Sequence, residues 1–175
     1  MRYLVISCSL SPSSRSRILA RIAHQHLEAR GLGAEFIELA DLNLPLCDGA
    51  SVYGQPAVQE IGEKIARARG VILAAAIYNY DVNSAAKNLI ELTGDAWTDK
   101  VVGFVCAAGG HGSYMSVMPF ANSLMLDFRC VIIPRFVYTI RAAPEDKLFG
   151  DQVIHARTEE LTTELVRITD ALFPV

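Results

Sequence analysis

The stretch YLVISCSLSPSSRS, residues 3–16, decides the expected fold. Residues 2–7 are mostly apolar and predict a buried strand, and a helical pattern begins near Ser16. Between them, residues 8–16 hold five serines, one proline and one arginine, with no glycine and no acidic residue. Hydroxyls, backbone amides at a helix start and a basic side chain are the parts of an anion site. The sequence therefore predicts a phosphate held at a strand-to-helix turn.

Outward from this stretch, strand and helix patterns alternate along the chain. Buried strands are predicted at residues 2–7, 34–39, 70–77, 100–107 and 130–139. Helices are predicted at residues 16–30, 56–69, 84–93, 113–128 and 152–172. Such alternation is typical of an α/β fold, here a doubly wound, five-stranded parallel sheet with helices on both faces. A length of 175 residues suits one domain, residues 1–175.

Composition narrows the class of protein. A net charge of −3, from 16 basic and 19 acidic residues, gives no electrostatic footprint for nucleic acid. The apolar run at 71–77 is too short to cross a membrane, and the apolar segment before Cys8 is too short for a signal peptide. Four cysteines without a CxxC pair, and four histidines without ligand spacing, predict no metal site. A cytoplasmic protein without membrane or nucleic-acid partners is expected.

The first loop allows two interpretations. Cys8 after the first strand, with an arginine beyond it, resembles the low-molecular-weight tyrosine phosphatases, whose motif separates Cys and Arg by five residues. Here six residues separate Cys8 from Arg15, which displaces the arginine from bidentate geometry, and the chain has no Asp-Pro for a general acid. The other interpretation is a cofactor phosphate, although Ser14 or Ser16 can equally serve as a helix cap. The cofactor is favoured, and a phosphatase using Cys8 remains the alternative.

Two more loops follow buried strands of the predicted sheet. YNYDVNSAAKNLIEL (78–92) follows the third strand, and AAGGHGSYM (107–115) follows the fourth. Glycines in the second of these let a backbone approach a flat ligand, and tyrosines in the first offer aromatic edges. Because ligands of such sheets bind at the carboxyl ends of strands, we expect the three loops to meet there. The connection at 40–55 is long enough to be functional as well.

Taken together, the three loops resemble the NADPH-dependent FMN reductase family of flavodoxin-like flavoproteins. Residues 8–16 resemble its Gly-Ser-x-Arg-x-x-Ser phosphate loop, residues 78–92 are similar to its P-x-Y-N-x-S-x-x-G-x-L-K-N segment, and GGHG resembles its glycine-rich loop. The chain departs from the family with Cys8 for Gly, Ser11 for Arg, Ala76 for Pro, and Ala85-Ala86 for the Gly before Leu-Lys-Asn. The resemblance implies a flavodoxin-like sheet with strand order 2-1-3-4-5.

The resemblance also implies an FMN site. It places the FMN phosphate among Ser9, Ser11, Ser14, Arg15 and Ser16. It places one edge of the flavin ring along Tyr78, Asn79, Tyr80, Asp81 and Val82. It places the other edge along Gly109, Gly110, His111 and Gly112.

The implied chemistry is ping-pong reduction. NADPH or NADH gives a hydride to the flavin and leaves, and a small-molecule electron acceptor, such as free flavin or a quinone, takes its place. The cofactor performs this chemistry, so no catalytic acid or base is expected, with His111 a possible auxiliary hydrogen-bonding group. A flavin-binding electron carrier without turnover shares all three loops and is a second alternative.

Apolar helices predict assembly. Residues 113–128 are apolar around the whole helix axis, and Leu89, Ile90 and Leu92 surround much of the helix before it. Such a surface exceeds what a monomer normally exposes, which predicts a homodimer or homotetramer, as the resemblance also implies. The alternative is that the loop at 40–55 covers the patch within one chain.

Overall fold

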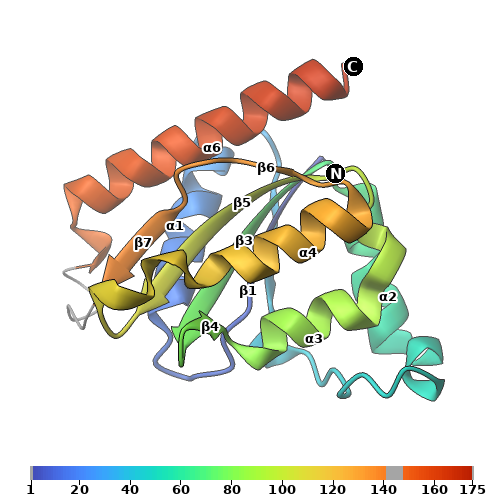
Figure 1. Cartoon of the computed structure of the whole chain (residues 1–175). Coiled ribbons are helices and arrows are strands. Elements are labelled where there is room, and N and C mark those ends of the chain that lie inside the picture. Colours follow the sequence, from blue (N-terminus) through green and yellow to red (C-terminus); the bar gives the residue numbers. More distant parts are fainter. Residues whose placement is uncertain (1, 141–147, 175) are drawn as a thin grey trace.

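A seven-stranded sheet forms the centre of the molecule (Figure 1). The structure, a computed structural model, describes residues 2–140 and 148–174, with only the backbone of His111. Parallel neighbours follow the order β2-β1-β3-β5-β6, where β7 also pairs with β5 and β4 pairs with β3. The strands are β1 Tyr3–Ser7, β2 Glu35–Glu38, β3 Gly70–Tyr78, β4 Asp81–Val82, β5 Val101–Ala108, β6 Val131–Ile132 and β7 Val137–Ile140. The expected flavodoxin-like fold is confirmed.

The sequence predicts one continuous strand at residues 130–139. In the structure this segment is split into two strands, β6 and β7. Both pieces pair with β5 in parallel, at Val101–Val102 and at Val105–Ala108. Between them, Pro134 has no N–H to donate to the ladder, and Arg135 has a φ of 61°. The split therefore has a local cause and leaves the strand order unchanged. The short β4 is an additional antiparallel strand that turns back on β3.

Helices cover both faces of the sheet. On one face lie α1 (Arg15–Ala29) and α6 (Gln152–Leu172), and on the other lie α2 (Pro56–Arg67), α3 (Ser84–Thr93) and α4 (Met118–Phe128). Strand residues alternate between these layers: Leu4 and Ile6 pack on the α2–α4 side, and Tyr3 and Val5 on the α1–α6 side. Among the described helices, none pairs enough length with enough apolar character to cross a bilayer.

The helix expected at 113–128 begins later. Residues His111–Val117 form a 3-10 segment, η4, and the α-helix starts only at Met118. Pro119 lies in the first turn of α4, where its missing N–H leaves no bond unmade. The consequence is that the glycine loop after β5 leads into a tight, irregular turn beside the sheet edge before α4 begins.

The long connection at 40–55 packs against α3. Two hydrogen bonds from Asn88 of α3 hold this connection in place. The Asn88 side-chain oxygen accepts from Cys47 N at 2.8 Å, and the Asn88 side-chain nitrogen donates to Pro45 O at 2.9 Å. Leu92 packs with Val52 in a small cluster under this loop. The expected excess apolar surface on α3 is therefore wrong, because Leu89, Ile90 and Leu92 are buried within the chain. On α4, Met125 and Leu126 stay exposed.

Candidate functional site

The loops after β1, β3 and β5 meet around one cavity of about 720 Å³ at the carboxyl edge of the sheet. This size suits a cofactor. From the first loop it is lined by Ser9, Ser11, Ser13, Ser14, Arg15 and Ser16. From the second it is lined by Ala76, Ile77, Tyr78, Asn79 and Tyr80. From the third it is lined by Ala107, Ala108, Gly109, Gly110, Gly112 and Ser113.

The start of α1 gives the cavity an anion-binding end. Ser14 is the N-cap, and its hydroxyl accepts a hydrogen bond from Arg17 N at 3.2 Å. The amides of Arg15 and Ser16 have no acceptor within the described part of the chain, as expected for the first turn of a helix. The sequence left open whether one serine merely caps this helix. Ser14 does so. The other hydroxyls hydrogen-bond within the loop: Ser16 Oγ lies 3.0 Å from Ser14 Oγ, Ser11 Oγ lies 3.4 Å from Ser13 Oγ, and Ser9 Oγ accepts from Ser11 N at 3.3 Å.

Arg15 supplies the positive charge at this end. Its side chain is half-buried, and it makes no ion pair or hydrogen bond with any other described residue. It is also the only charged residue among the described residues that line the cavity. A guanidinium in this position, beside two free amides, matches a phosphate group well.

A strained hairpin forms the second wall. Tyr78 pairs with Asp81, and the two residues between them, Asn79 and Tyr80, have φ values of 51° and 64°. Two positive φ values define the tight turn that suits the twist of a hairpin, yet a tyrosine there costs on the order of 1 kcal/mol. The Tyr80 hydroxyl would lie 3.4 Å from a Cβ built on Gly112. The hairpin thus places an aromatic ring beside the glycine loop.

The hairpin turns Asp81 and Val82 away from the cavity lining. Asp81 is exposed, and its carboxylate accepts a hydrogen bond from Val82 N at 2.7 Å. Val82 is buried in the core on the α2–α4 side of the sheet. Both residues support the wall rather than form its surface. The side chain of His111 lies outside the described parts of the chain.

The glycine loop leaves room for a flat ligand. A Cβ built on Gly109 or Gly110 would meet no atom within 4 Å, and both residues line the cavity. Tyr138 holds this loop in place, because its hydroxyl donates to Gly110 O at 2.7 Å and lies 2.7 Å from Ser113 Oγ. Side chains at these glycines would extend into open space beside the cavity.

Asn83 joins the first two loops, a role that the sequence did not suggest. Its side-chain nitrogen donates to Cys8 O at 2.8 Å, and its side-chain oxygen accepts from Ala76 N at 3.1 Å. Asn83 N also donates to Ala76 O at 2.8 Å. Asn83 is buried, so these bonds fix the ends of β1 and β3 relative to each other. The available signal was an asparagine directly before the helix predicted at residues 84–93.

Cys8 is a core residue, which does not favour a role as a nucleophile. Its amide donates to Ala74 O at 2.9 Å, and its side chain is fully buried on the α2–α4 side. Burial raises the pKa of the Cys8 thiol far above its ordinary value, and Glu38 and Cys106 raise it further. A reactive cysteine needs a thiolate, so the phosphatase alternative is not favoured. The φ of Cys8 is negative, so the family's glycine is not required for the turn.

The residues present fit FMN. An anionic phosphate matches the α1 end, and a flat aromatic ring matches the slot between the Tyr80 hairpin and Gly109–Gly110. Within residues 2–140 and 148–174, no group of three or more His, Cys, Asp or Glu side chains can hold a metal ion.

A doubly wound sheet with free helix-start amides and an arginine at its first strand-to-helix turn is typical of flavodoxin-like, mononucleotide-binding proteins. Residues 1–145 match the family model described as NADPH-dependent FMN reductase. The chain belongs to the NADPH-dependent FMN reductase family, as the sequence resemblance predicted. The description of this family names FMN and NADPH, the cofactor and a reductant that the sequence resemblance implied.

One curated relative matches about half of the chain. An iron-sulfur flavoprotein of Methanocaldococcus jannaschii is 31% identical over 98 residues, which cover 52% of this chain. The chain matches about half the length (51%) of that curated relative.

Among solved structures, the flavoenzyme NAD(P)H:(acceptor) oxidoreductase of Paracoccus denitrificans has a TM-score of 0.78 at 18% identity, over 97% of each chain. An apo NADH:FMN oxidoreductase has a TM-score of 0.74 at 17% identity, over 94% of this chain and 87% of that one. At such identities these structures support the fold alone.

Proposed function

We propose that this protein oxidises NADPH or NADH and passes the electrons through bound FMN to a small-molecule acceptor. The observation that carries the proposal is one cavity that has a cationic, amide-rich end at α1 and a neutral, flat slot between two loops. Apart from Arg15, its described lining holds no carboxylate, imidazole, amine or thiol. When bound, FMN supplies the hydride chemistry, and these residues bind and orient it.

The proposal includes a ping-pong order, in which reductant and acceptor use the same open side of the cavity in turn. Tyr78 and Tyr80 stand at the rim with exposed fractions of 55% and 72%, so this side is reached from solvent. The reductant and the acceptor would both contact these two tyrosines, and they would therefore exclude each other. The same proposal places the protein in the cytoplasm, where reduced nicotinamide nucleotides are available.

The proposal is tested by the visible absorption of the purified protein, by titration of the apoprotein with FMN, and by steady-state oxidation of NADPH with a quinone or free flavin. We expect a flavin spectrum, saturable binding of one FMN per chain and turnover. Absence of FMN binding at micromolar protein would refute the proposal. FMN binding without turnover would support the electron carrier instead.

Replacing Cys8 by serine is expected to leave FMN binding and NADPH oxidation largely intact. The thiol has no step in flavin chemistry, and its fully buried position makes the change a matter of packing and of one buried hydroxyl. A loss of about 1 kcal/mol in the free energy of unfolding is expected. Rates per bound FMN and urea unfolding curves measure the two effects. Inactive protein that retains FMN would return Cys8 to the chemistry.

We also propose that a second copy of the chain packs against η4 and α4. Both elements expose apolar side chains: Tyr114 and Met115 in η4 are 39% and 60% exposed, and Met125 and Leu126 in α4 are 37% and 82% exposed. Ser113, next to Tyr114, lines the cavity, so a partner here would border the site. Light scattering at low micromolar protein is expected to give at least twice the 19.1 kDa chain mass. A monomer that keeps its mass at high concentration would contradict this.

A further inference from the structure

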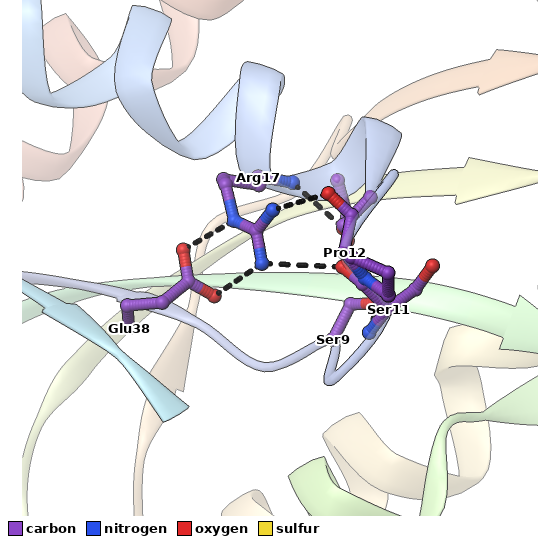
Figure 2. A network of polar contacts seen from close by, with 7 residues as sticks. Ser9, Ser11, Pro12, Arg17 and Glu38 are labelled. Carbon is purple, nitrogen blue, oxygen red and sulfur yellow. Dashed lines mark hydrogen bonds and ion pairs between the residues drawn. The ribbon is translucent and has the colours of Figure 1, made fainter. Parts of the chain in front are cut away.

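The Arg17 side chain hydrogen-bonds to the backbone of the first loop and forms an ion pair with Glu38 at the end of β2 (Figure 2). Its guanidinium donates to Ser11 O at 3.1 Å and to Pro12 O at 3.0 Å. On the other side, Nε lies 2.6 Å from Glu38 Oε2, and Nη2 lies 3.4 Å from Oε1. The side chains of Arg17 and Glu38 are only 17% and 10% exposed. One guanidinium thus joins the phosphate loop to the neighbouring strand.

These contacts lie on the outer side of the loop. Arg17, Pro12 and Glu38 line a separate hollow, and none of them lines the FMN cavity. The guanidinium therefore draws the carbonyl of Pro12 toward this outer side. Because the peptide bond is planar and trans, the N–H of the next residue, Ser13, points to the opposite side of the loop. Ser13 is one of the residues that line the FMN cavity.

The Arg17 guanidinium has a second effect on the loop, because it neutralises the charge of Glu38. The Glu38 carboxylate lies at the carboxyl end of β2, next to the strand that carries the phosphate loop, and is mostly buried. An unpaired carboxylate there would repel a bound phosphate through a poorly screened environment. The pair with Arg17 neutralises this charge, and the bidentate geometry fixes the direction of the guanidinium.

We propose that Arg17 and Glu38 form a brace that sets the phosphate loop for binding, with Arg17 as a positioning residue that does not touch FMN. Two peptide carbonyls are held away from the anion, and one strand carboxylate is neutralised. In contrast, Arg15 has no such partner among the described residues and is free to contact the ligand. This inference rests on the proposed function, since it concerns how the same cavity holds FMN.

The test compares FMN with riboflavin, which has the same ring but no phosphate. Arg17→Met is expected to weaken FMN binding about tenfold or more, and to change riboflavin binding less than about threefold. Arg21→Met is the matched control, because Arg21 is exposed on the same helix, lines the same outer hollow and bonds to no described residue. It removes the same charge without removing the brace, so both affinities should stay within about threefold.

Two further variants separate geometry from charge. Arg17→Lys keeps the charge but not the planar fork, and is expected to weaken FMN binding nearly as much as Arg17→Met. The double variant Arg17→Met/Glu38→Gln removes the buried unpaired carboxylate, so it should fold even if Arg17→Met does not, and still bind FMN weakly. Wild-type affinity in either variant would overturn the brace.

The outcomes distinguish this inference from the proposed function. If the wild-type protein binds neither FMN nor riboflavin, the proposed function fails. If it binds FMN and Arg17→Met binds equally well, the brace fails while the function stands. Equal losses of FMN and riboflavin affinity in Arg17→Met would mean a general structural role, and would also overturn the inference.

Discussion

Arg15→Glu is expected to weaken FMN binding at least about a hundredfold while the protein stays folded. A charge-assisted hydrogen bond to phosphate contributes about 1.5–3 kcal/mol, and a carboxylate adds repulsion to its loss. Since about 1.4 kcal/mol corresponds to a factor of ten, the two effects together exceed a factor of one hundred. The fold should not suffer, because Arg15 is half-buried, bonds to no described residue and opens α1. An acidic residue in the first turn of a helix stabilises it.

Fluorescence titration with FMN and riboflavin measures the effect. Riboflavin affinity should change little, because it has no phosphate for Arg15 to contact. Arg21→Glu reverses the same charge on the same helix away from the cavity, and its effect should be small and disappear with added salt. If Arg15→Glu and Arg21→Glu weaken FMN equally, Arg15 is not a phosphate ligand.

The sheet was predictable because its central strands, β1, β3 and β5, are buried on both faces. Strand β3 is apolar from Val71 to Ile77, and parallel strands of this kind appear in sequence as unbroken apolar runs. The break between β6 and β7 was visible in Pro134, but the apolar residues around it suggested one strand. The sequence predicted one helix at residues 113–128, but α4 begins only at Met118. The apolar pattern of this segment does not show where the 3-10 segment ends and the α-helix begins.

The site was predictable as far as its residues follow directly on strands. The serines, tyrosines and glycines named from the sequence line the cavity because each comes just after a carboxyl end of β1, β3 or β5. Asp81 and Val82 do not, because a two-residue turn folds them back beside Tyr78 and Ile77. A hairpin this tight needs positive φ values, which Asn79 suggested and Tyr80 did not.

The bonds that hold the loops could not be predicted, because their partners are distant in sequence. Arg17 and Glu38 are 21 residues apart, and Asn83 and Cys8 are 75 residues apart. Local pattern describes which segment forms a strand or helix, whereas these contacts depend on which strand ends become neighbours. One sequence of 175 residues offers many arginines and glutamates to pair. Only the strand order selects among them.

Asn83→Ala is expected to lower the melting temperature by about 10 °C. Truncation leaves the Cys8 carbonyl and the Ala76 amide buried without this partner, and each such group costs about 1–3 kcal/mol. A total near 3 kcal/mol corresponds to about 6–12 °C in a chain of this size. Asn122→Ala is the matched control, because Asn122 is exposed on α4 and makes no side-chain hydrogen bond to a described residue. It should leave the melting temperature within about 2 °C.

Asn83→Asp separates the two bonds of this side chain. An aspartate keeps an oxygen for Ala76 N but sets a carboxylate against the Cys8 carbonyl, where the native side chain donates. We therefore expect Asn83→Asp to be no more stable than Asn83→Ala above pH 6, where an ordinary carboxyl is ionised. Because Cys8 leads directly into the phosphate loop, both variants should also weaken FMN more than riboflavin. Calorimetry and flavin titration measure these effects, and an aspartate variant as stable as wild type would show that the bond to Cys8 does not hold the loop.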